Sequence, residues 1–264
     1  MWKILFSVCI VFSLNLSAQT TDWVKSFGGT ASDKGISIGT DSLGFIYCSG
    51  YFNNEATFGN ITLTNNNLST WGNNKENFIF KMDSLGTVLW AVAGGNLSGG
   101  CCDDRALGMH VTPGGDVFIT GTFWSSYKVG SYTNPMCQVG NGPFGTGLNS
   151  ADNSLLLKLD KDGNCVWAIG FGADQGGSGS APCPGGTNDV DDHSYDVKVD
   201  DDGFIYVTGF FAGISADFDN LSITNPHWDN DCQPMGYIGK LDPNGNWLWV
   251  ESFDGVKDQR GSRD

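Results

Sequence analysis

The sequence predicts an all-β fold assembled from several similar antiparallel sheets. Among its 264 residues the chain has 38 glycines, and 12% of its residues are aromatic. Short aliphatic or aromatic runs alternate with clusters of Gly, Asn and Asp, which is the spacing of strands and turns. No stretch shows a sustained apolar period of 3.6 residues, so the chain is not largely helical. Two blocks of sequence also recur in the same order three times, which indicates a repeat architecture.

The first block predicts two strands joined by a tight turn. It recurs without gaps as residues 33–52, 104–123 and 192–211. Each copy opens on an aspartate: Asp33, Asp104 and Asp192. Bulky side chains then alternate with small or polar ones, as expected of an inner strand crowded near an axis. The turn follows in each copy and carries a glycine that supplies a positive φ.

A short variable strand comes next, and the second block then predicts two further strands. The variable strand carries Phe58, Val129 or Phe218. The second block recurs as residues 77–90, 154–167 and 236–249. It contains a strand, another Asp-opened turn and a last strand with a tryptophan that also begins the next unit. These boundary residues are Trp23, Trp90, Trp167 and Trp249.

The units 23–90, 90–167 and 167–249 each predict one blade of a β-propeller. A four-stranded antiparallel sheet cannot bury both faces alone, but radial stacking against neighbouring sheets does bury them. A β-helix is disfavoured because its coils are much shorter than these units. Separate small sandwiches are disfavoured because each unit has too few strands. We therefore predict three complete four-stranded blades.

A fourth unit begins at residue 249 and stops at residue 264. Residues 249–253 copy residues 23–27, so the chain also starts with a last-strand segment that has no blade of its own. We expect an incomplete or open ring, with the chain being the N-terminal fragment of a larger protein. The alternative is a natural half-propeller that closes by oligomerisation.

The two blocks resemble a family of bacterial β-propeller repeats called seven-bladed β-propeller (SBBP) repeats. The shared pattern is D-x-x-G-I-x-x-D-x-x-G-x-x-Y-x-x-G followed by F-I/V-x-K-x-D-x-x-G-x-x-x-W, and the resemblance covers nearly everything from Trp23 onward. It implies an exported extracellular or cell-surface protein, often multidomain, with no general enzymatic activity. Longer inserts, cysteines in the loops of units two and three, and the early end depart from that pattern.

The N-terminus predicts a secretory signal peptide over residues 1–18. Lys3 is followed by an apolar run over residues 4–14, and Ala18 is the small residue after which we expect cleavage. Residues 19–264 would then form the repeat domain of a secreted or cell-surface protein. No second apolar run is long enough to span a membrane.

The charge balance disfavours partners that carry negative charge. Acidic residues outnumber basic ones by 29 to 14, giving a formal net charge of −15. Nucleic acids and anionic membrane surfaces are bound through Lys and Arg patches. We therefore expect neither as a partner.

Cysteines of units two and three predict disulfides between loops of one blade. Unit one lacks cysteine at both insert positions, and export supplies an oxidising compartment. We predict Cys183–Cys232, and Cys137 with Cys101 or Cys102. The strand cysteines Cys48 and Cys165 align with hydrophobic residues and are interpreted as buried hydrophobes. A lone Cys-Cys pair without a nearby histidine argues against zinc.

The remaining candidates for site chemistry are few. His110, His193 and His227 do not recur, and no catalytic set follows from their spacing. We interpret the three recurrent aspartates as structural hydrogen-bond acceptors at the neighbouring turn rather than as a channel ring. Calcium is the one candidate metal, with Asp189, Asp191 and Asp192 as its ligands, and no other cofactor is predicted. Aromatic side chains that could stack on sugars are Trp71, Trp124 and Trp228, although loop packing is the competing interpretation.

The sequence favours a non-enzymatic scaffold that binds protein or glycan through loop inserts on one propeller face. A secreted hydrolase or lyase acting on polysaccharide is the alternative and would need paired carboxylates. A third hypothesis is an architectural module of a larger surface protein. Further C-terminal blades or domains, or self-association through open blade edges, would be its partners.

Overall fold

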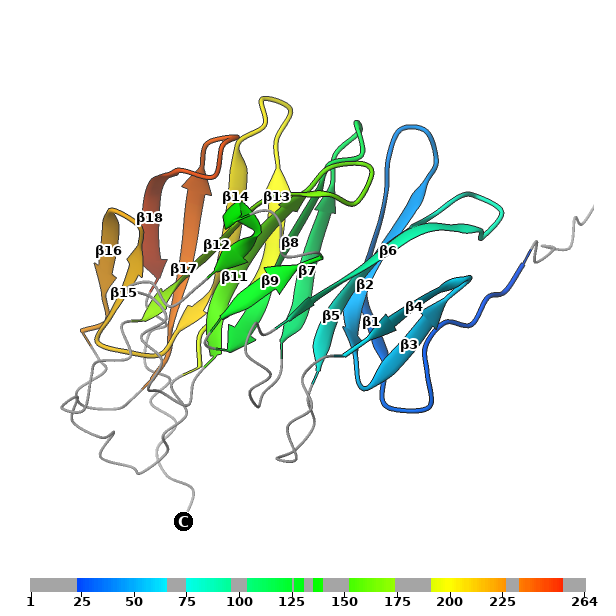
Figure 1. Cartoon of the computed structure of the whole chain (residues 1–264). Helices are drawn as coiled ribbons and strands as arrows, with labels where there is room; N and C mark the ends of the chain where they lie inside the picture. The colour runs from blue at the N-terminus through cyan, green and yellow to red at the C-terminus, as the bar shows by residue number, and fades with distance from the viewer. Residues whose placement is uncertain are drawn as a thin grey trace, which may run out of the picture.

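The chain folds into antiparallel β-sheets in a computed structural model (Figure 1). The structure describes residues 23–65, 75–95, 104–124, 126–130, 135–139, 152–173, 191–226 and 233–253. The predicted signal peptide, the Cys183–Cys232 pair, Cys101, Cys102, Asp189, Trp71, Trp228 and His227 lie outside these residues. Within the described ranges no helix is long and apolar enough to cross a membrane.

Three four-stranded antiparallel meanders follow one another along the chain, as the repeat predicts. The first contains β1 (Lys34–Thr40), β2 (Ile46–Phe52), β5 (Glu76–Met82) and β6 (Val88–Gly95). The second contains β7 (Arg105–Val111), β8 (Val117–Trp124), β11 (Asp152–Leu159) and β12 (Cys165–Ala173). The third contains β13 (His193–Val199), β14 (Ile205–Phe211), β17 (Met235–Leu241) and β18 (Trp247–Phe253).

Each predicted variable strand is the first arm of a short hairpin inserted between the second and third strands of its meander. The hairpins are β3 (Glu55–Phe58) with β4 (Ile61–Thr64), β9 (Tyr127–Val129) with β10 (Gln138–Val139), and β15 (Ser215–Phe218) with β16 (Leu221–Thr224). Strand β9 pairs with β6, and β15 pairs with β12. The hairpin of one meander therefore extends the sheet of the preceding meander, which makes the first two sheets six-stranded.

The tight turns have the chemistry that the sequence predicts. In the first one, Asp41 Oδ1 accepts hydrogen bonds from the backbone N–H groups of Leu43 and Phe45, both at 3.0 Å. Gly44 then takes a φ of 81°, in the left-handed region that side chains disfavour. The equivalent glycines Gly115 and Gly203 have φ values of 92° and 85°. Short bonds from the backbone to the side chain that opens the turn, which is Asp41, Thr112 or Asp200, fix the register of each strand pair.

A second glycine recurs in the middle strand of each meander because the neighbouring backbone approaches closely. A Cβ added at Gly50 would collide with the carbonyl oxygen of Lys34. Gly121 meets Arg105 and Gly209 meets His193 in the same way. At this level the inner strand carries a β-bulge in all three meanders. The bulge brings the backbone of the inner strand against the glycine of the second strand. The glycine of the Ser/Thr-Gly pair in the second strand is therefore a structural requirement.

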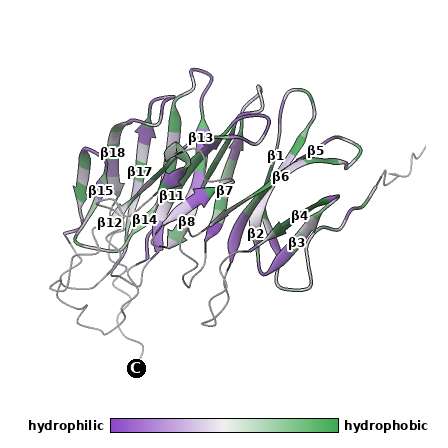
Figure 2. Cartoon of the chain, in the orientation of Figure 1, coloured by the Kyte–Doolittle hydropathy of each residue, from purple (hydrophilic) through white to green (hydrophobic). Residues whose placement is uncertain are grey.

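The core lies between the faces of successive sheets. One cluster, with Tyr47 and Ile79, joins the first sheet to the second. Another, with Phe171 and Trp247, joins the second sheet to the third. A third cluster covers the opposite face of the first sheet and includes Phe58 and the partly buried Phe27. Hydrophobic and hydrophilic residues accordingly alternate along the strands in Figure 2.

The boundary tryptophans join each sheet to the next meander. The indole N–H of Trp90 donates to the carbonyl oxygen of Lys161 at 3.1 Å, and its ring lies against Gly163 in the same turn. Lys81 Nζ donates to that carbonyl at 3.2 Å. The Trp167 ring lies against Gly245, the equivalent turn glycine of the third meander. The recurrent tryptophan is therefore an interlocking residue between units.

One disulfide prediction is wrong. Cys137 pairs with Cys165, with 5.9 Å between the two Cα atoms, and not with Cys101 or Cys102. Cys137 ends the short helix η1 (Pro135–Cys137), and η1 and β10 both contact β12, where Cys165 is the first residue. Because the hairpin of β9 and β10 extends the first sheet, the disulfide links that sheet to β12 of the second, and Cys165 is bonded rather than a free buried hydrophobe. Cys48 is a free, partly buried thiol, and burial raises its pKa to about 11.

We expect the Cys137–Cys165 bond to stabilise the fold by about 3–4 kcal/mol, because it closes a loop of 28 residues. The double variant Cys137→Ser with Cys165→Ser should lose that amount in urea unfolding. Cys48→Ser serves as the matched control and should leave the midpoint nearly unchanged. Recovery of Cys137 joined to Cys101 or Cys102 in non-reducing peptide maps would contradict the assignment.

Candidate functional site

The two ends of the strands differ in character. Tight turns built from recurrent residues close one end, where β1, β7 and β13 finish. At the other end, called the insert end because long inserts precede these strands in the sequence, Asp152 begins β11 and His193 begins β13. A groove lies at the turn end and a polar cluster at the insert end. We describe both, because each brings together side chains that could bind a ligand.

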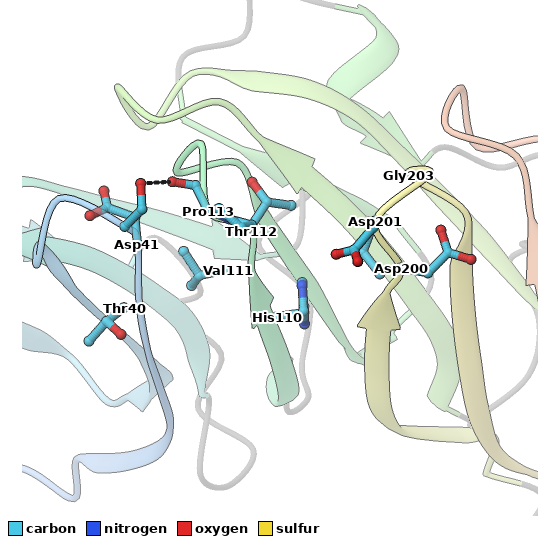
Figure 3. A pocket seen from close by; sticks show the side chains of 11 residues that line it. Thr40, Asp41, His110, Val111, Thr112, Pro113, Asp200, Asp201 and Gly203 are labelled. Atoms are coloured by element: carbon cyan, nitrogen blue, oxygen red, sulfur yellow. Dashed lines mark hydrogen bonds between the residues drawn. The ribbon is translucent and has the colours of Figure 1, made fainter.

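The groove has a volume of about 580 Å³ and is bounded by the turns that follow β1, β7 and β13. Figure 3 shows His110 on one wall, with Asp200 and Asp201 on the turn opposite. Ser42 Oγ donates to the carbonyl oxygen of Pro113 at 2.8 Å, which ties the first two turns together. The groove is therefore a gap between adjoining frame elements.

The carboxylate of Asp41 in this groove is engaged in bonds that hold the strands and turns together. Its Oδ2 accepts a hydrogen bond from the Tyr47 hydroxyl at 3.0 Å, and Lys81 Nζ lies 3.7 Å away. Burial alone would raise its pKa, but the N–H groups of Phe45 and Leu43, the Tyr47 hydroxyl and Lys81 together hold that pKa below its usual value. Asp41 is thus an ionised structural acceptor.

His110 and the third turn supply the remaining chemistry of the groove. Burial, and then Lys198, lower the pKa of His110, so the imidazole is neutral at physiological pH. Asp200 uses Oδ1 to accept N–H groups of its own turn, and Asp201 is exposed. Ser42 is bonded to Pro113, so the described residues that line the groove offer hydrogen-bonding groups to a ligand but no activated nucleophile.

The recurrent aspartates are structural acceptors, as predicted, although they bind strand ends rather than turns. Asp192 Oδ2 accepts the N–H of Ala173 at 2.7 Å, at the end of the second sheet's outer strand. Its Oδ1 accepts the N–H of Ala212 at 2.9 Å, just after β14. Asp33 binds Gly29 and Asn53 in the same way. Each of these two aspartates therefore fastens its meander to the outer-strand segment that precedes it.

Asp192 differs from Asp33 in its electrostatics. It is fully buried, and burial raises its pKa to about 8, although the two N–H groups oppose the rise. Asp191 and Asp152, both acidic, also contribute to the increase. Both carboxylate oxygens of Asp192 thus accept backbone hydrogen bonds within the fold.

Two acids and a histidine come together at the insert end. Asp152, Asp191 and His193 each place one potential ligand atom within 4.8 Å of the others. Asp152 N–H donates to Asp191 Oδ1 at 3.0 Å, and Asp192 N–H donates to the carbonyl oxygen of Asp152 at 2.9 Å. These bonds fasten residues 191–192 to the start of β11, so the second and third meanders share the cluster.

Aromatic side chains flank this cluster. The His193 ring stacks on Phe210 with 5.0 Å between centroids, and the Tyr195 hydroxyl lies 3.4 Å from His193 Nδ1. Trp124 is opposite Asp152 in the antiparallel pairing of β8 with β11, so the two side chains leave the same face. Trp124 is partly exposed. The insert end therefore combines carboxylates, an imidazole and an accessible indole.

The equivalent junction between the first two meanders carries two basic side chains on the same backbone. Asp104 N–H donates to the carbonyl oxygen of Lys75 at 2.9 Å, which reproduces the Asp192–Asp152 bond. Lys75 thus occupies the position of Asp152, and Arg105 occupies that of His193. The frame is repeated, but the chemistry displayed on it is specific to each junction.

Sequence reasoning identified part of this cluster. Asp191 and Trp124 are among the sequence candidates. Asp152 belongs to the second unit and is not grouped with Asp191 and His193, which belong to the third. The replacement of two basic residues at these repeat positions by Asp152 and His193 is the signal that could have found the cluster. Two carboxylates with an imidazole suit Zn²⁺ or Mn²⁺ better than Ca²⁺, which prefers oxygen ligands alone. Calcium binding stays a prediction.

No protein-family model matches the sequence, and no curated protein matches it significantly.

Proposed function

We propose that this chain is an exported, non-enzymatic β-propeller scaffold that binds a glycan at its insert end. Stacked antiparallel meanders with their inner strands adjacent support the blade arrangement, since β7 contacts both β1 and β13. The Cys137–Cys165 disulfide fits an oxidising compartment, in keeping with the predicted signal peptide. The SBBP-repeat resemblance is part of the same proposal.

The observation that carries the binding site is the contrast between equivalent junctions. Bonds that hold the frame recur from unit to unit, whereas the side chains of Asp152 and His193 are replaced by Lys75 and Arg105 at the first junction. Rigid frames that display variable side chains beside long loops are the usual basis of recognition.

A glycan fits these side chains better than a protein surface does. An exposed indole stacks on the apolar face of a sugar ring, and carboxylates accept hydrogen bonds from sugar hydroxyls. Trp124 and Asp152 leave the same face of the sheet beside Asp191 and His193, so one sugar could contact both kinds of group. Its hydroxyls would replace water at the cluster.

A glycan array probed with the secreted chain tests the proposal, followed by titration of any hit with variants. Trp124→Ala and Asp191→Asn should each weaken binding at least about tenfold, which corresponds to about 1.4 kcal/mol. The matched controls are Lys75→Gln at the first junction and His110→Ala in the turn-end groove, both of which should bind normally. Loss with His110→Ala and normal binding with Trp124→Ala would place the site in the groove instead.

A hydrolase or lyase acting on polysaccharide is the second candidate, and the Asp152–Asp191 pair favours it. Carboxylate oxygens of the two residues lie within 4.8 Å of each other, near the separation of about 5 Å used by retaining glycosidases. Release of new reducing or unsaturated sugar ends, abolished by Asp152→Asn, would support this activity. Binding without turnover of any bound glycan would exclude it.

A further inference from the structure

We propose that the outer face of the third sheet is a docking site for the first meander of a second copy of this chain. This docking face consists of Phe204, Tyr206, Ile238, Trp249 and Phe253. The positions are those at which the first and second sheets contact the meander that follows them. The interface would thus continue the one already repeated within the chain.

Exposure identifies the face, because residues at three of its positions are buried where a meander follows, although Phe45 and Trp90 are only partly buried there. Ile238 is 39% exposed, whereas Ile79 and Leu156 at the same repeat position are 0% exposed. Phe253 is 53% exposed, whereas Phe171 at its position is fully buried. The third sheet therefore presents an apolar surface, and most of its counterparts in the preceding sheets are interior.

The interlocking residues of this face are also in place. Lys240 Nζ lies 4.0 Å from the centroid of the Phe204 ring, as Lys81 Nζ lies 4.3 Å from that of Phe45. Trp249 is 37% exposed, whereas Trp167 is 6% exposed against the next turn. In the first sheet, the lysine and the tryptophan both donate to one turn carbonyl. The third sheet holds the same pair at its surface.

The first meander carries the complementary acceptor, and residues 23–29 mark where it lies. Trp23 Nε1 donates to the carbonyl oxygen of Ser84 at 2.9 Å, as Trp90 does to Lys161. Gly28 pairs with Thr57, just as Gly172 pairs with Asp217. Residues 23–29 thus occupy the place of a preceding sheet's outer strand.

Phe27 also resembles the equivalent residue of an outer strand, and it identifies residues 23–29 as the segment that strand β18 of a second copy could replace. It packs on Phe58 at 6.1 Å between centroids, as Phe171 packs on Phe218 at 5.4 Å. Residues 23–27 form no strand, and Val24 is 85% exposed. The segment supplies the anchoring side chains of an outer strand, and among the described residues no further strand pairs with it on its other side. Strand β18 of another copy has the same Trp and Phe and a complete sheet.

Exchange would keep the anchoring contacts and bury more surface. Trp249 and Phe253 of one copy would replace Trp23 and Phe27 of the other, while the rest of the docking face gains cover that residues 23–29 cannot give. Burial of additional apolar area is the driving force. In a dimer with a twofold axis, the third sheet of each copy would dock on the first meander of the other. The ring would then contain six sheets, three from each copy, which is within the roughly four to eight blades of known propellers.

The charge of one residue opposes the docking of a second copy, so the strength of association should depend on salt and on that charge. Glu251 occupies the position of Lys25. Backbone N–H groups, that of Thr87 foremost, and then the charge of Lys25 lower the pKa of Asp83 on the acceptor. Docking therefore brings Glu251 toward an ionised Asp83, a repulsion between like charges that salt would screen. We expect reversible association that strengthens with ionic strength and with Glu251→Lys.

Sedimentation velocity of the secreted chain over a range of concentrations tests the proposal, with two variants of opposite expected sign. Phe253→Ala should lower the association constant at least about tenfold, because it weakens the incoming anchor. Phe27→Ala should raise it, because it weakens the competing segment of the acceptor. Circular dichroism on both variants checks that the fold is retained.

Three outcomes would overturn this assignment. They are a monomer at every concentration, an association constant unchanged by Phe253→Ala, and equal weakening by Phe253→Ala and Phe27→Ala. The last result would indicate non-specific contact through exposed aromatic rings. Dimerisation strengthened by Glu251→Lys would support the exchange independently, since that residue has no role in the glycan site.

Discussion

Replacing Asp192 with alanine is expected to lower the free energy of unfolding by about 4 kcal/mol. The change removes the acceptor for the backbone N–H groups of Ala173 and Ala212, which lie 2.7 and 2.9 Å from its oxygens. Each buried donor left without a partner costs about 1–3 kcal/mol, and a small cavity adds to the loss. Urea unfolding followed by tryptophan fluorescence measures the effect.

Asp33→Ala is the matched control, because Asp33 makes the same two kinds of bond at the edge of the first meander. Its oxygens accept from Gly29 at 2.6 Å and Asn53 at 3.3 Å, but the residue is partly exposed. Water can replace the lost acceptor there, so we expect a loss of about 1 kcal/mol. Equal losses for the two variants would mean that burial does not decide the strength of this contact.

The pH dependence of the conservative variant Asp192→Asn tests the charge state of the same residue. Burial raises the pKa from 3.8 to about 8 in the folded chain, so the folded state holds a proton that the unfolded state has lost between these values. The contribution of Asp192 to stability is then complete below pH 4 and declines as the pH rises toward 8. Relative to the asparagine variant, the native chain should therefore lose stability across this interval. If the native chain instead gained stability relative to Asp192→Asn as the pH rises, the two N–H groups would be keeping the carboxylate ionised.

The recurrent residues explain why so much of the frame could be predicted. Asp33, Asp104 and Asp192 each precede an inner strand, and the glycine of each turn follows its aspartate at a fixed distance. These are local requirements of backbone hydrogen bonding, so they are repeated in the sequence wherever the structure repeats them. The four strands of each meander and the boundary tryptophans follow from the same reasoning.

Contacts between different sheets are not encoded locally, which is why sequence reasoning missed them. Cys165 looks like a strand hydrophobe because Val88 and Trp247 occupy its position elsewhere, yet it bonds to Cys137, which directly precedes β10 of the first sheet. Asp152 and His193 belong to different units and meet only because residues 191–192 attach to β11. The second arms β4, β10 and β16 of the hairpins were not predicted, since strands of about four residues or fewer give little periodicity.

Trp167→Ala is expected to destabilise the chain by about 4 kcal/mol, the typical cost of truncating a buried aromatic side chain. Trp167 is 6% exposed and lies within the cluster that joins the second sheet to the third. Its ring contacts Gly245 in the turn before β18, so its loss opens a cavity at the junction of two meanders. Thermal or urea unfolding gives the magnitude.

Trp249→Ala is the corresponding change at the one boundary where, among the described residues, no meander follows. Because this indole is 37% exposed, we expect a loss of about 1 kcal/mol when the protein is dilute. At high concentration the gap between native chain and variant should widen, because association through the docking face stabilises only the native chain. A gap that is large and independent of concentration would mean that Trp249 already packs inside its own molecule. The concentration dependence of the stability lost in Trp249→Ala therefore distinguishes a tryptophan that packs within its own molecule from one that packs against a second copy.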